Sequence, residues 1–265
     1  MNRDGKLTSL HKLDDVPQKK PLTELTAAAT NRNRVLPPKM VLCDAGWSWI
    51  QKEGIDKLRE MLEQRAKSGS KKDLVFPRQQ AVEVCTKIFV MCNQPDPYNW
   101  SKDLYTRHGK TIEEYLSVVA LPGLKQARNK SQDPSAFFTA FLDIWDDYVF
   151  FSKWMTNFFH ILDRIYAEPN NLSTAEKTSL IKFEKMVFQP YQPKLLQCVL
   201  FLIKSDRNGD YEGDMDISLV IDTAVVYKKM DSVAMKYSEH LEEKMLSATR
   251  QYYKDRHHDW RYLDG

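Results

Sequence analysis

Apolar residues recur three or four positions apart along most of this chain, which is the spacing of amphipathic helices. The longest such segment runs from Phe137 to Tyr166 and contains no glycine or proline. Asp133 suits a helix cap, and Pro134 suits the first helical turn. The pattern therefore predicts a helix, bent near Phe150 into two, whose second part is apolar around most of its circumference. A helix of that kind is buried on several sides or covers a partner.

The same spacing predicts further helices, which are expected over 44–66, 78–92, 100–128, 173–190, 193–205, 217–225 and 233–256. The breaks between them fall at polar loops and at Pro190 and Pro193. Pro122 should kink the helix over 100–128, whose inner face should include Val119. Ser173 and Glu176 have the spacing of a capping box. Almost no strand pattern is present, so the predicted fold class is all-α.

The helix over 78–92 has more apolar residues than one packed face requires. They form two stripes, Ala81–Val84–Ile88–Met91 and Val82–Cys85–Phe89. One stripe can face the core of the protein. The other stripe requires either deeper burial or a partner, and the pattern leaves these two alternatives open.

Composition limits the possible classes of protein. A chain of 265 residues can bury a sizeable core, as one large domain or two small ones. The net charge of +3 is too small to indicate nucleic-acid binding, and no apolar run reaches membrane-spanning length. The four cysteines form no CxxC pair, and the N-terminus has no secretory signal, so we expect reduced thiols in a cytoplasmic and nuclear protein. The polar, basic, proline-containing segment 1–39 is predicted to be a disordered arm.

The chain lacks the residue patterns of catalytic and metal sites. The acidic loop Asp206–Asp216 fails the spacing of a calcium-binding EF-hand, because its sixth position is Tyr211 and its twelfth is Ile217. His257 and His258 would need metal ligands from elsewhere, so a frayed tail is the better interpretation. No phosphate-binding loop, nucleophile elbow or zinc-protease motif is found. We therefore predict a non-enzyme, without cofactor or metal, that acts by binding or scaffolding.

The order and spacing of four segments resemble the N-terminal part of cullins, in particular plant cullins of the F-box class. These segments are Gly46–Leu58 (GWSWIQKEGIDKL), Val75–Asp96 (VFPRQQAVEVCTKIFVMCNQPD), Trp145–Tyr166 (WDDYVFFSKWMTNFFHILDRIY) and Leu195–Asp210 (LLQCVLFLIKSDRNGD). The resemblance implies a right-handed helical solenoid of cullin repeats. A complete five-helix repeat is then expected over 40–168, followed by an incomplete second repeat over 169–265.

The resemblance also implies a role in ubiquitin-dependent protein degradation. Cullins of this class bind a BTB-fold adaptor at the N-terminal repeat and, through it, F-box proteins. Their C-terminal domain holds a RING subunit and the lysine that accepts a ubiquitin-like modifier. This sequence stops before that domain, so no RING subunit is expected for it. The chain is thus expected to be an adaptor-binding scaffold fragment, which competes with longer cullins for the adaptor.

In the family, the adaptor docks on the second and fifth helices, where aromatic side chains act as anchors. The resemblance assigns the adaptor surface to Ala81, Val82, Cys85, Thr86, Phe89 and Ile161. Ala81, Cys85, Phe89 and Ile161 occupy aromatic positions of the family, and only Phe89 retains a ring. The alternative is a helical-repeat protein whose adaptor surface has diverged to another protein partner or been lost. A nucleic-acid-binding repeat that uses the basic arm is a more distant alternative.

Overall fold

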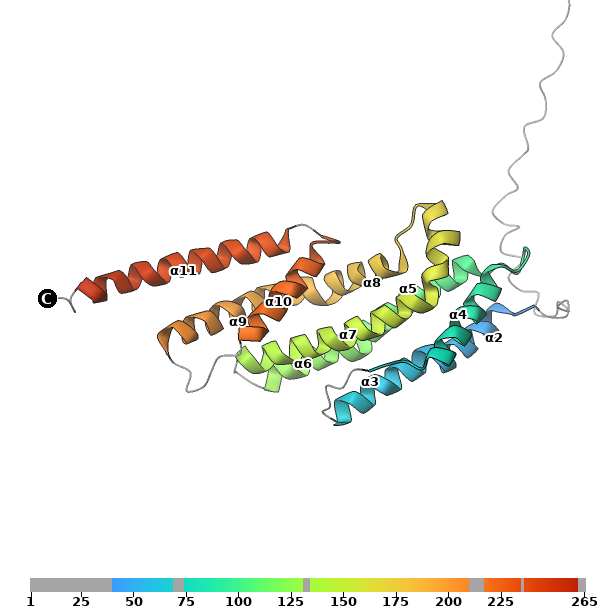
Figure 1. The fold of residues 1–265 in the computed structure, drawn as a ribbon, viewed down its shortest axis with the longest axis horizontal. Coiled ribbons are helices and arrows are strands. Elements are labelled where there is room, and N and C mark those ends of the chain that lie inside the picture. The colour runs from blue at the N-terminus through green and yellow to red at the C-terminus, as the bar shows by residue number, and fades with distance from the viewer. Residues whose placement is uncertain (1–39, 69–73, 131–133, 210–216, 235, 262–265) are drawn as a thin grey trace, which may run out of the picture. The chain divides into compact units, whose positions relative to one another are not determined.

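Helices make up the regular structure in the part of the chain that this computed structural model describes, residues 40–68, 74–130, 134–209, 217–234 and 236–261 (Figure 1). The all-α prediction is confirmed for these residues. The α-helices are α2 (Cys43–Ile50), α3 (Lys57–Ser68), α4 (Arg78–Cys92), α5 (Ser101–Tyr115), α6 (Leu121–Lys130), α7 (Pro134–Leu162), α8 (Ala175–Phe183), α9 (Gln189–Asn208), α10 (Ile217–Met230) and α11 (Tyr237–Arg261). The predicted arm, Asp133, the side chains of His257 and His258, and residues 210–216 of the acidic loop lie outside the described residues.

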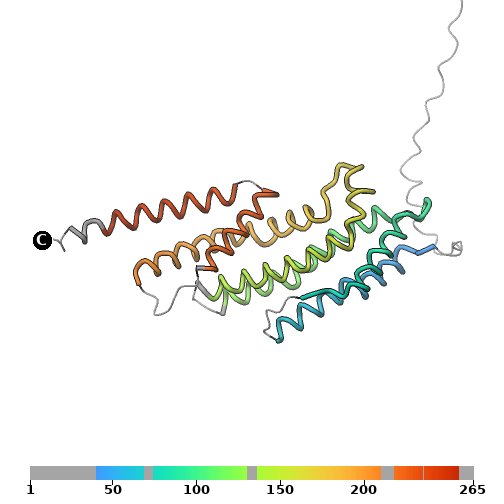
Figure 2. The backbone as a smooth tube through the Cα atoms, in the orientation of Figure 1, coloured from blue at the N-terminus to red at the C-terminus, as the bar shows by residue number. Residues whose placement is uncertain are grey.

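Several of these α-helices continue into the next one through a short π-helical turn, without a loop, as the backbone trace in Figure 2 shows. The π-helical turns are η2 (Gln51–Asp56), η3 (Leu116–Ala120), η4 (Asp163–Ala167) and η6 (Glu184–Phe188), and η5 (Glu168–Asn170) is a 3-10 turn. The η3 turn ends two residues before Pro122, the predicted position of a kink. Proline has no N–H group to donate to the preceding turn, so the regular α-helical pattern is interrupted near it.

The π-helical turns change two details of the sequence-based picture. Leu116 is buried as predicted, but Val119 is half exposed, because the extra residue in η3 rotates the following side chains around the helix axis. The predicted break at Pro190 and Pro193 is wrong. Helical backbone continues from α8 through η6 into α9, with Pro190 in the first turn of α9 and Pro193 inside the helix.

The helix α7 is the central element, because it packs against α3, α4, α5, α6, α8, α9 and α10. The predicted bend near Phe150 is wrong, since α7 is one α-helix of 29 residues. No glycine or proline interrupts it, and neighbours on several sides bury most of its apolar residues. Figure 1 shows α7 lying between the pair α2 and α4 and the run from α8 to α9.

Aromatic contacts join α7 to helices from both halves of the chain. Phe151 stacks on Tyr115 of α5 with ring centroids 4.1 Å apart, and Tyr148 stacks on Phe183 of α8 at 4.7 Å. Such pairs add about 1 kcal/mol each beyond the area that they bury. One continuous core therefore runs from α2 to α11.

The start of α8 differs by one residue from the predicted capping box. Thr174 is the N-cap, and its hydroxyl oxygen accepts a hydrogen bond from the backbone N–H of Lys177 at 3.2 Å. The Ser173 carbonyl instead accepts a hydrogen bond from the Tyr105 hydroxyl at 2.7 Å. The other member of the predicted box, Glu176, forms an ion pair with Lys229 of α10 at 3.0 Å. These tertiary contacts replace the reciprocal capping bonds that the local spacing predicted.

Candidate functional site

The helix α4 carries the residues that the sequence assigned to a partner surface. Its inner side packs on α2, η2, α5 and α7, and buries Val84, Ile88 and Met91 completely. Gly54 of η2 allows this close approach, because a β-carbon there would stand 3.3 Å from Val84. The first of the two predicted stripes is therefore the core stripe. The packing of α4 is complete without its outer residues, which remain available for another contact.

The second stripe lies on the outer side of α4. Val82 is 55% exposed and Phe89 is 50% exposed, while Thr86 is exposed between them. Val90 is also exposed and extends this outer face by one residue that the sequence-based assignment missed. Its position four residues after Thr86 and eight after Val82 is the signal that would have found it. Val82, Thr86, Phe89 and Val90 form what we call the α4 outer face.

Ala81 and Cys85 lie where α4 meets α7, and both are partly buried. The Cys85 thiol donates a weak hydrogen bond to the backbone carbonyl of Asn157 on α7, with 3.4 Å between sulfur and oxygen. Burial raises the pKa of this thiol, so it remains protonated and able to donate. Cys85 therefore connects the two helices and leaves only part of its surface for a partner.

Ile161 differs from the other predicted site residues. The sequence-based interpretation expected its side chain to point away from the core, but Ile161 is only 9% exposed and belongs to the core cluster. The neighbouring exposed position on α7 is His160, whose ring nitrogen Nδ1 lies 2.8 Å from the Asn157 carbonyl oxygen. Since α7 runs straight into η4, residue 161 turns toward its own core, whereas residue 160 faces outward. Ile161 can support the α4 outer face but offers little contact area itself.

A shallow depression lies beside the α4 outer face and was not predicted. Trp49 of α2 lines it together with Val82, Thr86, Lys87 and Val90 of α4. The Lys87 ammonium group stands 5.0 Å from the centre of the Trp49 ring, which is a cation–π distance. Trp49 therefore adds apolar surface next to the α4 outer face. Only the tertiary packing of α2 on α4 brings this residue to the site.

The chemistry of this surface is apolar contact. Exposed valines and a phenylalanine lie beside one hydroxyl, one lysine, one glutamate and one glutamine, and no group here pairs a nucleophile with a base. A search of the described residues finds no cluster of histidine, cysteine and carboxylate side chains that could hold a metal ion. Within the same residues, no helix has the length and apolar character needed to cross a bilayer. Such a surface suits a protein partner.

Comparison with known proteins identifies the fold family. Residues 56–263 match the family model for the cullin α-solenoid domain. Cullin-1 of rice is 26% identical over 201 residues, which cover 76% of this chain and 25% of that protein. Putative cullin-like protein 1 of Arabidopsis thaliana is 25% identical over 232 residues, which cover 87% of this chain and 30% of that protein.

Shorter relatives are matched over more of their length. Cullin-like protein 3 of Arabidopsis thaliana is 22% identical over 226 residues, covering 85% of this chain and 82% of that protein. The chain thus spans about a quarter to a third of the first two relatives and most of the third. The family model covers well over half of the chain, and it includes both α4 and α7. This chain belongs to the cullin family.

Proposed function

We propose that this chain is a scaffold of a ubiquitin ligase and that it binds the BTB-fold adaptor of F-box proteins through the α4 outer face. The observation that carries the proposal is the exposure of Val82, Phe89 and Val90 on a helix whose inner side already packs a complete core. Large apolar side chains gathered on one face of a helix mark interaction sites. Membership of the cullin family supplies the kind of partner, and a scaffolding role requires no catalytic residues.

Phe89 is expected to dominate the binding energy. It is the largest exposed side chain of the α4 outer face and the one remaining ring among the four inherited aromatic positions. Burying a phenylalanine side chain contributes about 1.5–3 kcal/mol, and central aromatic residues are frequent hot spots. Val82 and Val90 would surround this ring and exclude water from it.

Calorimetric titration against the BTB-fold adaptor of plant F-box ligases tests the proposal. The wild-type chain should bind the adaptor with one-to-one stoichiometry. Phe89→Ala should weaken binding by about 2 kcal/mol, roughly thirtyfold in Kd. Phe201→Ala is the matched control, because Phe201 is also an exposed phenylalanine but belongs to α9. If Phe89→Ala binds the adaptor as tightly as wild type does, the interface does not lie on α4.

The proposal also concerns competition. Because a longer cullin of this class would use the same adaptor surface, the isolated 265-residue polypeptide should displace it. In a mixture with fixed amounts of adaptor and a longer cullin, added polypeptide should lower the amount of cullin that the adaptor captures. The Phe89→Ala variant should lower it far less. Displacement by both polypeptides alike would indicate a contact that does not involve the α4 outer face.

A second candidate keeps the scaffold and replaces the partner. Its support is the absence of a ring at residues 81, 85 and 161, which lie on the family's adaptor helices. Each lost ring removes about 1–3 kcal/mol of the original interface by analogy with alanine scanning. A pull-down from native extract with wild type and Phe89→Ala in parallel separates the candidates. A protein that is neither an adaptor nor an F-box protein, captured only by wild type, supports the second one.

A further inference from the structure

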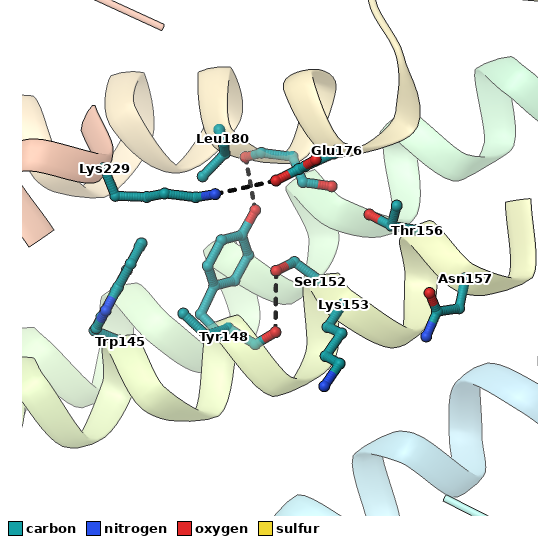
Figure 3. Close-up of a pocket in the computed structure, with 11 residues that line it drawn as sticks. Trp145, Tyr148, Ser152, Lys153, Thr156, Asn157, Glu176, Leu180 and Lys229 are labelled. Atoms are coloured by element: carbon teal, nitrogen blue, oxygen red, sulfur yellow. Dashed lines mark hydrogen bonds and ion pairs between the residues drawn. The ribbon is translucent and has the colours of Figure 1, made fainter. Parts of the chain in front are cut away.

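A groove on the other side of α7 has no part in the proposed adaptor contact. It lies between α7, α8 and α10, and has a volume of about 330 Å³ (Figure 3). On α7, Trp154 and Phe158 contact Phe76 on the side of α4. The groove residues Trp145 and Val149 lie about half a turn away from these two aromatic residues, at 100° per residue. The groove therefore faces away from α4 at Trp145 and Val149, and it reaches the α4 side only at Asn157, whose carbonyl accepts the Cys85 hydrogen bond.

The floor of the groove is apolar and rigid. Trp145, Tyr148 and Leu180 form it, and each is almost fully buried. The Tyr148 hydroxyl donates a 2.7 Å hydrogen bond to the Ser179 carbonyl oxygen, which fixes the ring between α7 and α8, as Figure 3 shows. The floor thus offers apolar surface, and its one hydroxyl already has a partner within the protein.

Exposed aliphatic residues extend the groove along its walls. Val149 of α7 is 41% exposed at the rim. On α10, Val225 and Ile221 precede the groove residue Lys229 by four and eight positions, so they share its helical face. Val225 is 58% exposed and Ile221 is 59% exposed. The helix α10 buries Val226, Tyr227 and Met230 instead, so its own packing does not use these two side chains.

The charged side chains of the groove are two lysines and one glutamate. Lys229 pairs with Glu176 at 3.0 Å, and both groups are exposed at the edge of the groove. Lys153 of α7 also lines the groove, on the side away from that pair in Figure 3, and no ion pair involving it is found within the described residues. Lys153 is therefore the one charged side chain of this lining whose charge no ion pair offsets among the described residues, and it favours a partner with a carboxylate near it.

We propose that this groove binds an acidic amphipathic helix of a protein partner. The groove residues on α7 run from Trp145 to Asn157, which corresponds to a length of about 18 Å at 1.5 Å per residue. A partner helix of about twelve residues matches that length. The apolar residues of the partner helix, at helical spacing, contact Trp145, Leu180 and Val149. The exposed side of α10 packs against the same apolar residues. An acidic residue beside these anchors faces Lys153.

Fluorescence anisotropy with designed peptides tests the proposal. The probe is a labelled, lactam-bridged helical peptide of about eighteen residues, with leucines on one face and glutamates flanking them. One control peptide has lysines in place of the glutamates, and another has the acidic sequence scrambled. The acidic amphipathic peptide should bind with a Kd below about 100 μM, at least tenfold tighter than either control.

Variants locate the binding site. Val149→Asp and Val225→Asp change exposed residues, and each should weaken binding of the acidic peptide at least tenfold. Val118→Asp places the same charge at another exposed valine, in η3, and should leave binding unchanged. Lys153→Glu should weaken binding of the acidic peptide several-fold and strengthen binding of the basic one. Circular dichroism of each variant confirms that the helices remain.

Three results would overturn the proposal. The first is the absence of saturable binding of the acidic peptide up to about 1 mM. The second is binding by Val149→Asp and Val225→Asp that matches wild type. The third is a dimer of the wild-type chain in sedimentation velocity that Val225→Asp converts to a monomer, which would assign the groove to a second copy of the chain. None of these measurements uses the adaptor, so their failure leaves the proposed function untouched.

Discussion

The buried Tyr148 hydroxyl of α7 donates a hydrogen bond to the backbone carbonyl of Ser179 in α8, with 2.7 Å between the oxygens. The two residues are 31 positions apart in sequence, and both are buried. Burial raises the pKa of Tyr148, so the hydroxyl is protonated and able to donate at neutral pH. The bond therefore joins the central helix to the helical run that follows it.

Tyr148→Phe should lower the free energy of unfolding by about 1 kcal/mol, because the variant keeps the ring and removes one buried hydrogen bond. Urea unfolding followed by circular dichroism measures the change. Tyr105→Phe is the matched comparison, since the Tyr105 hydroxyl donates a bond of the same length to the Ser173 carbonyl in a partly buried place. Water can replace that partner, so Tyr105→Phe should cost less. An equal loss of unfolding free energy in the two variants would contradict the difference in burial between the two hydroxyls.

Gly46→Ala should destabilise the fold by roughly 1–3 kcal/mol. A β-carbon on residue 46 would overlap the side chain of Met91 and approach Val41 to 2.8 Å, and Met91 has no exposed surface into which to move. Thermal unfolding measures the effect. Replacing Met91 by valine in both backgrounds should make the Gly46→Ala penalty smaller, because the overlapping atoms are then absent. Strict additivity of the two changes would show that the close contact is not the cause.

Gly109→Ala is the control for that experiment and should stabilise the protein by about 0.5–1 kcal/mol. Gly109 lies inside α5, where alanine has the higher helix propensity. A β-carbon there would stand 3.4 Å from the Lys182 side chain, which is an ordinary contact distance. A loss of stability at this position would indicate tighter packing between α5 and α8 than these distances show.

His108 should make the protein less stable in mild acid. The ring is buried, and neither ring nitrogen has a hydrogen-bond partner among the described residues, so desolvation, with a smaller effect of Lys182, lowers its pKa to about 4. Between pH 6.5 and about 4 the unfolded chain binds a proton here that the folded chain does not. Stability therefore falls as pH falls through this range, by up to about 3 kcal/mol in total.

The His108→Leu variant isolates this contribution from other titrating groups. Urea unfolding of wild type and variant at pH 7 and pH 5 gives two differences in free energy. The wild-type loss should exceed the variant's loss by about 2 kcal/mol. Asp147 and Asp163, whose pKa values burial raises, are present in both proteins and cancel in this comparison. Parallel pH profiles would show that His108 is accessible to protons in the folded state.

Restoring a ring at Cys85 or at Ile161 should have different consequences. Cys85→Tyr places a ring at the partly exposed edge of α4 and should strengthen adaptor binding several-fold in calorimetry. Ile161→Tyr enlarges a buried side chain and should cost about 1–3 kcal/mol of stability through overpacking. If the wild type fails to bind the adaptor and Cys85→Tyr binds it, the surface has lost its original partner. If Ile161→Tyr folds normally and binds more tightly, residue 161 contacts the adaptor directly.

Local sequence was sufficient for the class of fold and for the extent of α4. Apolar spacing placed α4 within one residue of its observed start, and the second stripe identified Val82 and Phe89 as candidates for a partner contact. The predictions of the fold class and of α4 succeeded because helical periodicity depends on residues three and four apart, which any sequence displays directly. Contact of Val82 and Phe89 with a partner remains a prediction. The repeat boundaries at 168 and 169 and the adaptor itself remain predictions.

The tertiary structure decided which apolar residues remain available. Spacing alone made Ile161 and Val119 look alike as apolar positions on a helix, yet packing buries the first and η3 exposes the second. The same packing brought Trp49 beside α4 and left Val225 uncovered on α10. The physical reason is that a residue's partners across the core come from distant segments. Helix periodicity says which residues share a face, and only the neighbouring helices determine whether that face is covered.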